Sequence, residues 1–100
     1  MSDFIPSPSI GEILIEEFME PMHISAYRLA QDINVPVSRI QAILRNDRRI
    51  TADTSLRLAR YFGLSDKYFL DLQCDIDIRE QKFKIGKEIS DIIPLADKVS

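Results

Sequence analysis

The chain has 100 residues, of which 45% are hydrophobic and 29% charged, and its formal net charge is −3. This length fits one domain, since globular domains have about 100–150 residues, and this composition is typical of a folded protein rather than a disordered one. The longest stretch without Asp, Glu, Lys or Arg, residues 4–11, contains two prolines, whereas a membrane helix needs about 20 apolar residues. We expect one cytosolic domain with no membrane segment and no secretory signal.

The residues available for chemistry are few. Cys74 is the single cysteine and His23 the single histidine, so neither a disulfide within the chain nor a zinc site can form from them. The three glycines are scattered and make no phosphate-binding loop or nucleophile elbow. We therefore expect no metal, no cofactor and no catalytic residue.

The charges are unevenly distributed along the chain. Residues 1–24 carry five acidic and no basic side chains, and residues 61–100 have a net charge of −2. Residues 25–60 carry seven arginines against three aspartates, a local net charge of +4. The middle third is therefore the one basic part, and its arginines suit phosphates and guanine edges.

Apolar residues at helical spacing predict five helices in chain order. The first follows the N-cap Ser9 and ends at Pro21. The second covers Ser25–Ile33 and ends at Asn34, a residue that tolerates left-handed backbone angles. No alternating strand pattern occurs in the sequence.

The remaining three helices follow the same signals. The third is predicted over Pro36–Asn46, with the proline in its first turn. The fourth begins at Thr51 and ends at Gly63. The fifth begins at Ser65-Asp66, has an interruption near Gly86 and ends before Pro94. We therefore expect an all-α fold.

The second and third helices have the dimensions of a helix-turn-helix. Ala30 is small where the helices cross, Asn34 occupies the turn position usually held by glycine, and Val35 fills the inside of the turn. The inner face is formed by Leu29, Ile33, Ile40 and Ile43. The alternative is an ordinary helical hairpin within a core.

The outer face of the third helix is the predicted DNA-reading surface, since the start of this helix enters the major groove in the motif. Arginine and glutamine pair bidentately with guanine and adenine. The predicted base-reading residues are Ser38, Arg39, Gln41 and Arg45, the last of which could reach either a base or the backbone. The predicted phosphate contacts are Ser25, Tyr27, Arg28, Gln31, Asn46, Arg48 and Arg49.

Two further predictions concern surfaces away from this face. Arg57 and Arg60, inside the fourth helix, are assigned to packing and intramolecular salt bridges. A helix-turn-helix protein reads two half-sites as a dimer, and the interface is predicted on the fifth helix and its neighbours. It draws on Phe69, Leu72 and Ile76 or on the thin apolar stripe beyond them.

Several sequence blocks together resemble the HigA family of antitoxins, helix-turn-helix proteins of the Cro/C1 (XRE) type. The blocks are Pro8–Leu14 leading into Glu16-Glu17-Phe18, Tyr27–Ala30, Val35–Ile40 and, most distinctive, Ile50–Gly63. The similarity covers residues 8–78, with a weaker echo in the tail. The chain departs from the family at Pro8, where histidine often precedes proline, and at Asn46-Asp47-Arg48, where a glycine-containing turn is common.

The resemblance implies a five-helix, lambda-repressor-like domain that dimerises, binds the operator DNA of its own operon and sequesters a HigB-type mRNA endonuclease toxin. It implies an N-terminal arm over residues 1–8, the helix-turn-helix domain over 9–78 and a helical extension over 79–100. Because such toxins are basic, acidic surfaces could attract one. The candidates are Glu12, Glu16, Glu17 and Glu20, or Asp71, Asp75 and Asp77.

Two other functions fit the same sequence. One is a plain helix-turn-helix repressor with no toxin partner, and the other is a protein-interaction module that keeps the motif without binding DNA. Composition and spacing alone lead to a dimeric helix-turn-helix DNA-binding protein, because the toxin leaves no mark in them.

Overall fold

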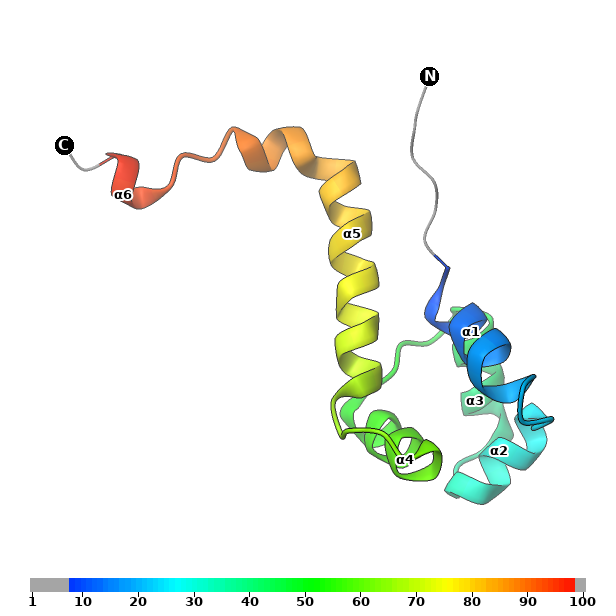
Figure 1. Ribbon diagram of the computed structural model, residues 1–100. Coiled ribbons are helices and arrows are strands. Elements are labelled where there is room, and N and C mark those ends of the chain that lie inside the picture. The colour runs from blue at the N-terminus through cyan, green and yellow to red at the C-terminus, as the bar shows by residue number, and fades with distance from the viewer. Residues whose placement is uncertain (1–7, 99–100) are drawn as a thin grey trace.

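A computed structural model of the chain describes residues 8–98, and the regular elements in this range are all helices. In chain order they are α1 (Ile10–Ile13), η1 (Leu14–Met19), α2 (Ala26–Ile33), α3 (Val37–Leu44), α4 (Ala52–Phe62), α5 (Tyr68–Ser90) and α6 (Leu95–Lys98). Figure 1 shows α1 to α4 gathered together, while α5 leads away from them toward α6. The predicted all-helical fold with an extended C-terminal helix is confirmed.

Most of the predicted helix ends are confirmed by their capping bonds. The hydroxyl of Ser9 accepts from the N–H of Glu12 at 3.1 Å, which begins α1, and Thr51 caps α4 in the same way. Gly63 ends α4 with φ of 73°, in the left-handed region that glycine adopts without a steric penalty.

The structure differs from the predicted helices at three places. The first helix widens into the π-helix η1, in which the N–H of Glu20 donates to the Ile15 carbonyl five residues earlier. Pro36 is the N-cap of α3 rather than a residue of its first turn, since its ψ of 141° is extended. The short helix α6 follows Pro94 and was not predicted. The interruption near Gly86 is confirmed, one residue earlier, at Ile85 with φ of −123° and ψ of 21°.

The core lies between α1, η1, α2, α3, α4 and the first half of α5. Phe69 is fully buried, and its ring centroid lies 5.3 Å from that of Phe18 and 6.3 Å from that of Phe62. Near the crossing of α1 and α3, a Cβ on Gly11 would lie 2.4 Å from the carbonyl oxygen of Leu44. Only glycine therefore fits at this contact, and the end of α3 is fixed against α1.

The second half of α5 does not join this core. Ile76 is the last buried residue of the described range, and the large apolar side chains after it are exposed. Residue 78, the predicted boundary, lies within α5, two residues after Ile76. Nothing is described for residues 1–7, which hold nearly all of the predicted N-terminal arm.

Candidate nucleic-acid interface

The turn between α2 and α3 has the geometry predicted for a helix-turn-helix. Asn34 lies in the left-handed region with φ of 64°, and its N–H donates to the carbonyls that end α2. The N–H of Val35 donates to the Ala30 carbonyl at 3.0 Å, and Ala30 is only 2% exposed where the helices cross. These bonds hold the two helices in one fixed orientation.

Three of the four predicted base-reading residues point away from the core. Ser38, Gln41 and Arg45 are exposed on α3 or at its C-terminal end. The carboxylate of Asp47 pairs with Arg45 at 3.3 Å, a contact between exposed groups that contributes little to stability. These side chains form a polar surface suited to the edges of bases in a groove.

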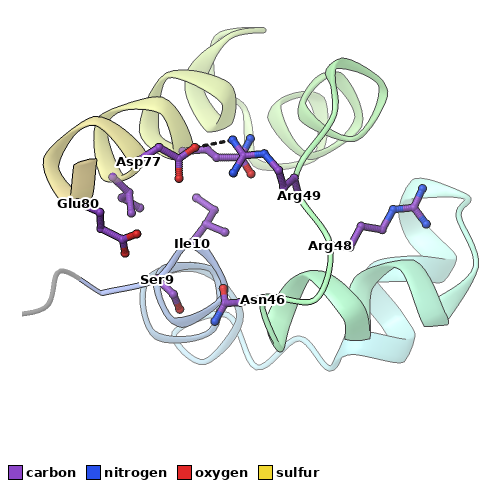
Figure 2. Close-up of a pocket in the computed structure, with 9 residues that line it drawn as sticks. Ser9, Ile10, Asn46, Arg48, Arg49, Asp77 and Glu80 are labelled. Carbon is purple, nitrogen blue, oxygen red and sulfur yellow. Dashed lines mark hydrogen bonds and ion pairs between the residues drawn. The ribbon is translucent and has the colours of Figure 1, made fainter. Parts of the chain in front are cut away.

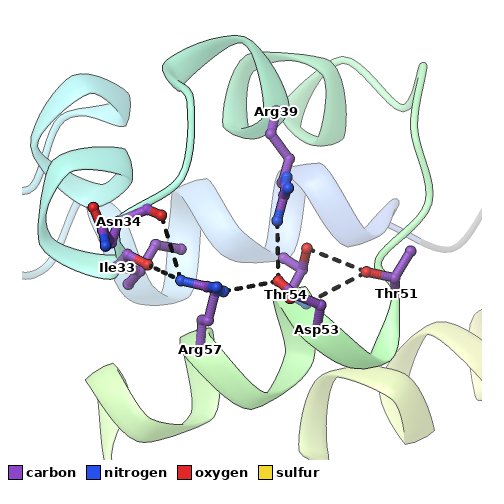
Figure 3. Close-up of polar contacts among 7 residues, drawn as sticks. All are labelled: Ile33, Asn34, Arg39, Thr51, Asp53, Thr54 and Arg57. Atoms are coloured by element: carbon purple, nitrogen blue, oxygen red, sulfur yellow. Dashed lines mark hydrogen bonds and ion pairs between the residues drawn. The ribbon is translucent and has the colours of Figure 1, made fainter.

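Arg39 is placed differently from these three residues. Its side chain is 24% exposed, and its Nη1 donates to the Asp53 carboxylate of α4 at 3.0 Å (Figure 3). The structure therefore does not bring Arg39 to the open surface beside Ser38 and Gln41 but joins it to α4.

Asp53 joins two arginines, a role that the sequence analysis did not predict. Its carboxylate accepts from Arg39 and also from Nε of Arg57 at 2.8 Å. These guanidiniums hold the pKa of Asp53 below its ordinary value of 3.8, Arg57 more than Arg39. The spacing of Asp53 and Arg57, four residues apart on a helix, was the available signal.

Arg57 also fastens the turn. Its Nη1 donates to the Ile33 carbonyl at 2.9 Å and to the Asn34 carbonyl at 3.3 Å, which are among the unpaired carbonyls at the end of α2 (Figure 3). The predicted intramolecular role of Arg57 is therefore confirmed.

Three of the predicted phosphate contacts, Ser25, Tyr27 and Arg28, lie at the N-terminal end of α2, and Gln31 lies in its last turn. Ser25 caps the helix by accepting from the N–H of Arg28, and Tyr27 is 69% exposed. Tyr27 and Gln31 line a shallow hollow together with Val37, at the start of α3. Backbone N–H groups and the positive end of the helix dipole at such a site favour phosphate.

Arg28 is placed by neighbouring groups on α2 and α4. Its Nε lies 3.4 Å from the Asp32 carboxylate one turn later, and the Tyr61 hydroxyl of α4 donates to the same carboxylate at 2.5 Å. This hydrogen bond raises the pKa of Tyr61. The Arg28 side chain remains exposed.

The loop between α3 and α4 carries the remaining predicted phosphate contacts. Asn46 adopts a left-handed conformation with φ of 63°, and in this way it takes the place of the glycine that is common in this turn. Arg48 points outward and makes no ion pair within residues 8–98, whereas Arg49 pairs with Asp77 of α5 (Figure 2). The Asp77 carboxylate raises the pKa of Arg49.

The predicted dimer residues need a correction. Phe69 is fully buried and Ile76 is 8% exposed, so both belong to the core of one chain and offer no surface to a second. Leu72 is half-buried against the same core. Phe69 and Ile76 were misassigned because helical spacing identifies an apolar face but not what covers it. The apolar stripe beyond them is exposed, at Ile78 and Ile89 among others.

Among residues 8–98, no group of three or more His, Cys, Asp or Glu side chains could hold a metal ion. No helix described there is both long and apolar enough to cross a bilayer.

The helix-turn-helix family model matches residues 15–69, which include the turn and all of α3 and α4. The chain therefore belongs to the helix-turn-helix family.

Within this class, the resemblance to HigA antitoxins is confirmed. The structure of an addiction module antidote protein of the HigA family from Coxiella burnetii is 41% identical, with a TM-score of 0.79 over 91% of this chain and 99% of that one. Antitoxin HigA from Pseudomonas aeruginosa, solved with the higBA promoter, is 35% identical, with a TM-score of 0.79 over 91% and 99%. Virulence-associated protein I of Dichelobacter nodosus is 44% identical over 92% of this chain and 84% of that protein.

Proposed function

We propose that this chain is a cytoplasmic antitoxin that binds double-stranded operator DNA as a homodimer, represses its own operon and neutralises a HigB-type mRNA endonuclease. One observation carries the DNA-binding part: α3 presents Ser38, Gln41 and Arg45 outward from a turn that Arg57 fastens to α4. A relative with 35% identity has been solved with promoter DNA, which supports the same use of this face. In this proposal the chain has no catalytic residue and needs no cofactor.

The phosphate contacts would come from both sides of α3. On one side, α2 supplies Ser25, Tyr27, Arg28 and Gln31, of which Tyr27 and Gln31 lie beside Val37 at the start of α3. The loop that follows α3 supplies Asn46, Arg48 and Arg49. Contacts on both sides fix the height and angle of a helix in a groove, while side chains on the helix read the bases.

The toxin part rests on membership of the HigA family together with the charge distribution. Glu12, Glu16, Glu17 and Glu20 are all exposed on α1 and η1 or just after them, and none of them is paired with an arginine of residues 25–60. Asp71 and Asp75 are exposed on α5, but Asp77 is already paired with Arg49. The glutamates are therefore the better surface for a basic partner, since they leave the arginines free for DNA.

DNA recognition is tested by incubating the chain with a random-sequence duplex library and sequencing what it retains. We expect a two-fold symmetric sequence with half-sites about 34 Å apart. Retention without any enriched sequence would contradict operator binding.

Toxin neutralisation is tested by expressing this chain together with the product of the neighbouring gene. We expect growth to be rescued, and we expect substitution of Glu12, Glu16 and Glu17 by lysine to slow association more than it changes dissociation, with a smaller effect in high salt. If there is no toxic neighbour, or growth is not rescued, the chain is a plain repressor.

A further inference from the structure

Gln73 of α5 makes an unusual pair of hydrogen bonds with the backbone of the loop that precedes α4. Its Oε1 accepts from the N–H of Ile50 at 2.8 Å, and its Nε2 donates to the Ile50 carbonyl at 2.9 Å. The side chain is 7% exposed, so both bonds are shielded from water. A side-chain amide that closes both bonds on one residue fixes the position of that backbone as well as its orientation.

This pair fixes one end of a very short segment. At the other end, the N–H of Asp47 donates to the Ala42 carbonyl at 2.8 Å, which ties the start of the loop to α3. Between the two fixed points lie only Arg48 and Arg49, both exposed. The directions in which these two arginines leave the backbone are therefore set by the bonds on either side of them.

Burial of the Ile50 side chain alone would not fix the orientation of the Ile50 backbone. Ile50 is 3% exposed, and this contact fixes where the loop packs. Apolar contacts are not directional, however, and leave the peptide plane free to tilt. The two hydrogen bonds are directional and determine that tilt.

We propose that Gln73 is a positioning residue for DNA binding, which sets the Arg48 and Arg49 side chains at the phosphate backbone when α3 lies in the groove. This inference rests on the proposed DNA-binding function and adds to it a residue on α5, outside the helix-turn-helix. Gln73 does not contact DNA; it acts through the Ile50 backbone.

The test compares Gln73→Met, which keeps the side-chain volume and removes both hydrogen bonds, with Gln73→Asn, which keeps the amide but is one methylene too short. Neither variant changes the charge. Met19→Ala serves as the control for stability, because Met19 is 5% exposed in η1 and lies outside the proposed DNA surface.

The full-length chains are titrated with a duplex enriched from the random library and with a shuffled duplex, at several salt concentrations. For both Gln73 variants we expect affinity for both duplexes to fall about tenfold, because phosphate contacts carry no sequence information. The slope of log K against log salt should become shallower by about one for each arginine displaced. Faster hydrogen exchange of the Ile50 amide should accompany this change, whereas Met19→Ala should melt at a lower temperature and keep the wild-type slope.

The outcomes separate this inference from the proposed function. If the wild-type chain enriches a sequence and the folded Gln73 variants bind it with wild-type affinity and slope, the positioning role is wrong and the DNA-binding proposal stands. If Met19→Ala loses affinity and slope to the same extent, the effect is one of stability and the positioning role is again wrong. If the wild-type chain binds no duplex, both are wrong.

Discussion

The guanidinium of Arg39 lies 3.0 Å from the carboxylate of Asp53, and this contact links the proposed recognition helix α3 to α4. Arg57 binds the same carboxylate and reaches back to the carbonyls of the turn. A single acidic side chain therefore joins the start of α3, the helix-turn-helix turn and α4. This arrangement decides how far Arg39 is able to move toward DNA, and it leads to the first prediction.

Loss of Asp53 should change the sequence preference by releasing Arg39. If Arg39 leaves Asp53 to read a base, Arg39→Ala should cost about 1–3 kcal/mol on the enriched duplex and little on a shuffled one. Asp53→Asn removes a negative charge and frees Arg39, so it should bind both duplexes more tightly, and the enriched duplex by the larger factor. Equilibrium titrations measure the affinity of each variant for the two duplexes. Arg60→Ala removes one exposed charge from α4 and is the matched control. Equal losses on both duplexes for Arg39→Ala would show that Arg39 reads no base.

Substitutions of Arg49 and of Asp77 should have opposite effects on DNA binding. Arg49→Ala should weaken binding to every sequence and make the slope of log K against log salt shallower by about one. Asp77→Asn removes the carboxylate that competes with phosphate for Arg49, so nonspecific binding should strengthen. Filter binding at increasing salt distinguishes the two variants. An unchanged slope for Arg49→Ala would mean that Arg49 only holds the loop to α5.

Acid should weaken the contact between α3 and α4. The folded pKa of Asp53 lies below its ordinary value of 3.8, mainly because Arg57 donates to it. Its contribution to stability is therefore complete above that ordinary value and is lost as the pH falls through the lower folded pKa. Urea denaturation between neutral pH and pH about 3 should show this loss in the wild-type chain. Asp53→Asn should have a flatter profile, and parallel profiles would contradict the assignment.

The left-handed conformation of Asn34 predicts a difference between two substitutions. Asn34→Ala should lower the free energy of unfolding by about 1 kcal/mol, because a Cβ without a hydrogen-bonding group is disfavoured at φ of 64°. Asn34→Gly should stay within about 0.5 kcal/mol of the wild type, since the strain it removes offsets the flexibility it gives the unfolded chain. Urea midpoints measured by circular dichroism compare the two. A glycine variant as unstable as the alanine variant would contradict this account.

The exposed stripe on the second half of α5 is the expected dimer interface. Ile78 and Ile89 are 48% and 50% exposed and line one hollow on this helix. Ile78→Glu and Ile89→Glu should each shift the chain toward monomer, because a charge buried between two helices lacks water. Sedimentation equilibrium measures the shift. Ser90→Glu adds the same charge one residue further along and is the control. A wild-type chain that is monomeric at micromolar concentration would contradict the dimer.

Much of this protein follows from local sequence signals. Ser9, Ser25, Thr51 and Gly63 mark helix ends because capping needs only a side chain and the next few residues. The same is true of Asn34, whose left-handed backbone is a property of one residue. The arginine-rich middle third and the helix-turn-helix spacing led to the prediction of a DNA surface on α3. The HigA resemblance added the antitoxin function, which no local physical signal carried.

The tertiary structure alone decided which side chains are free and which are already bound. Arg39 and Asp53 are 14 residues apart, and Ile50 and Gln73 are 23 apart, so neither pair belongs to one helical repeat. Helical periodicity placed Phe69, Leu72 and Ile76 on one apolar face but could not show that the chain's own core covers it. Contacts between distant segments depend on how the helices pack, and this packing assigned Gln73, Asp53 and Asp77 their partners.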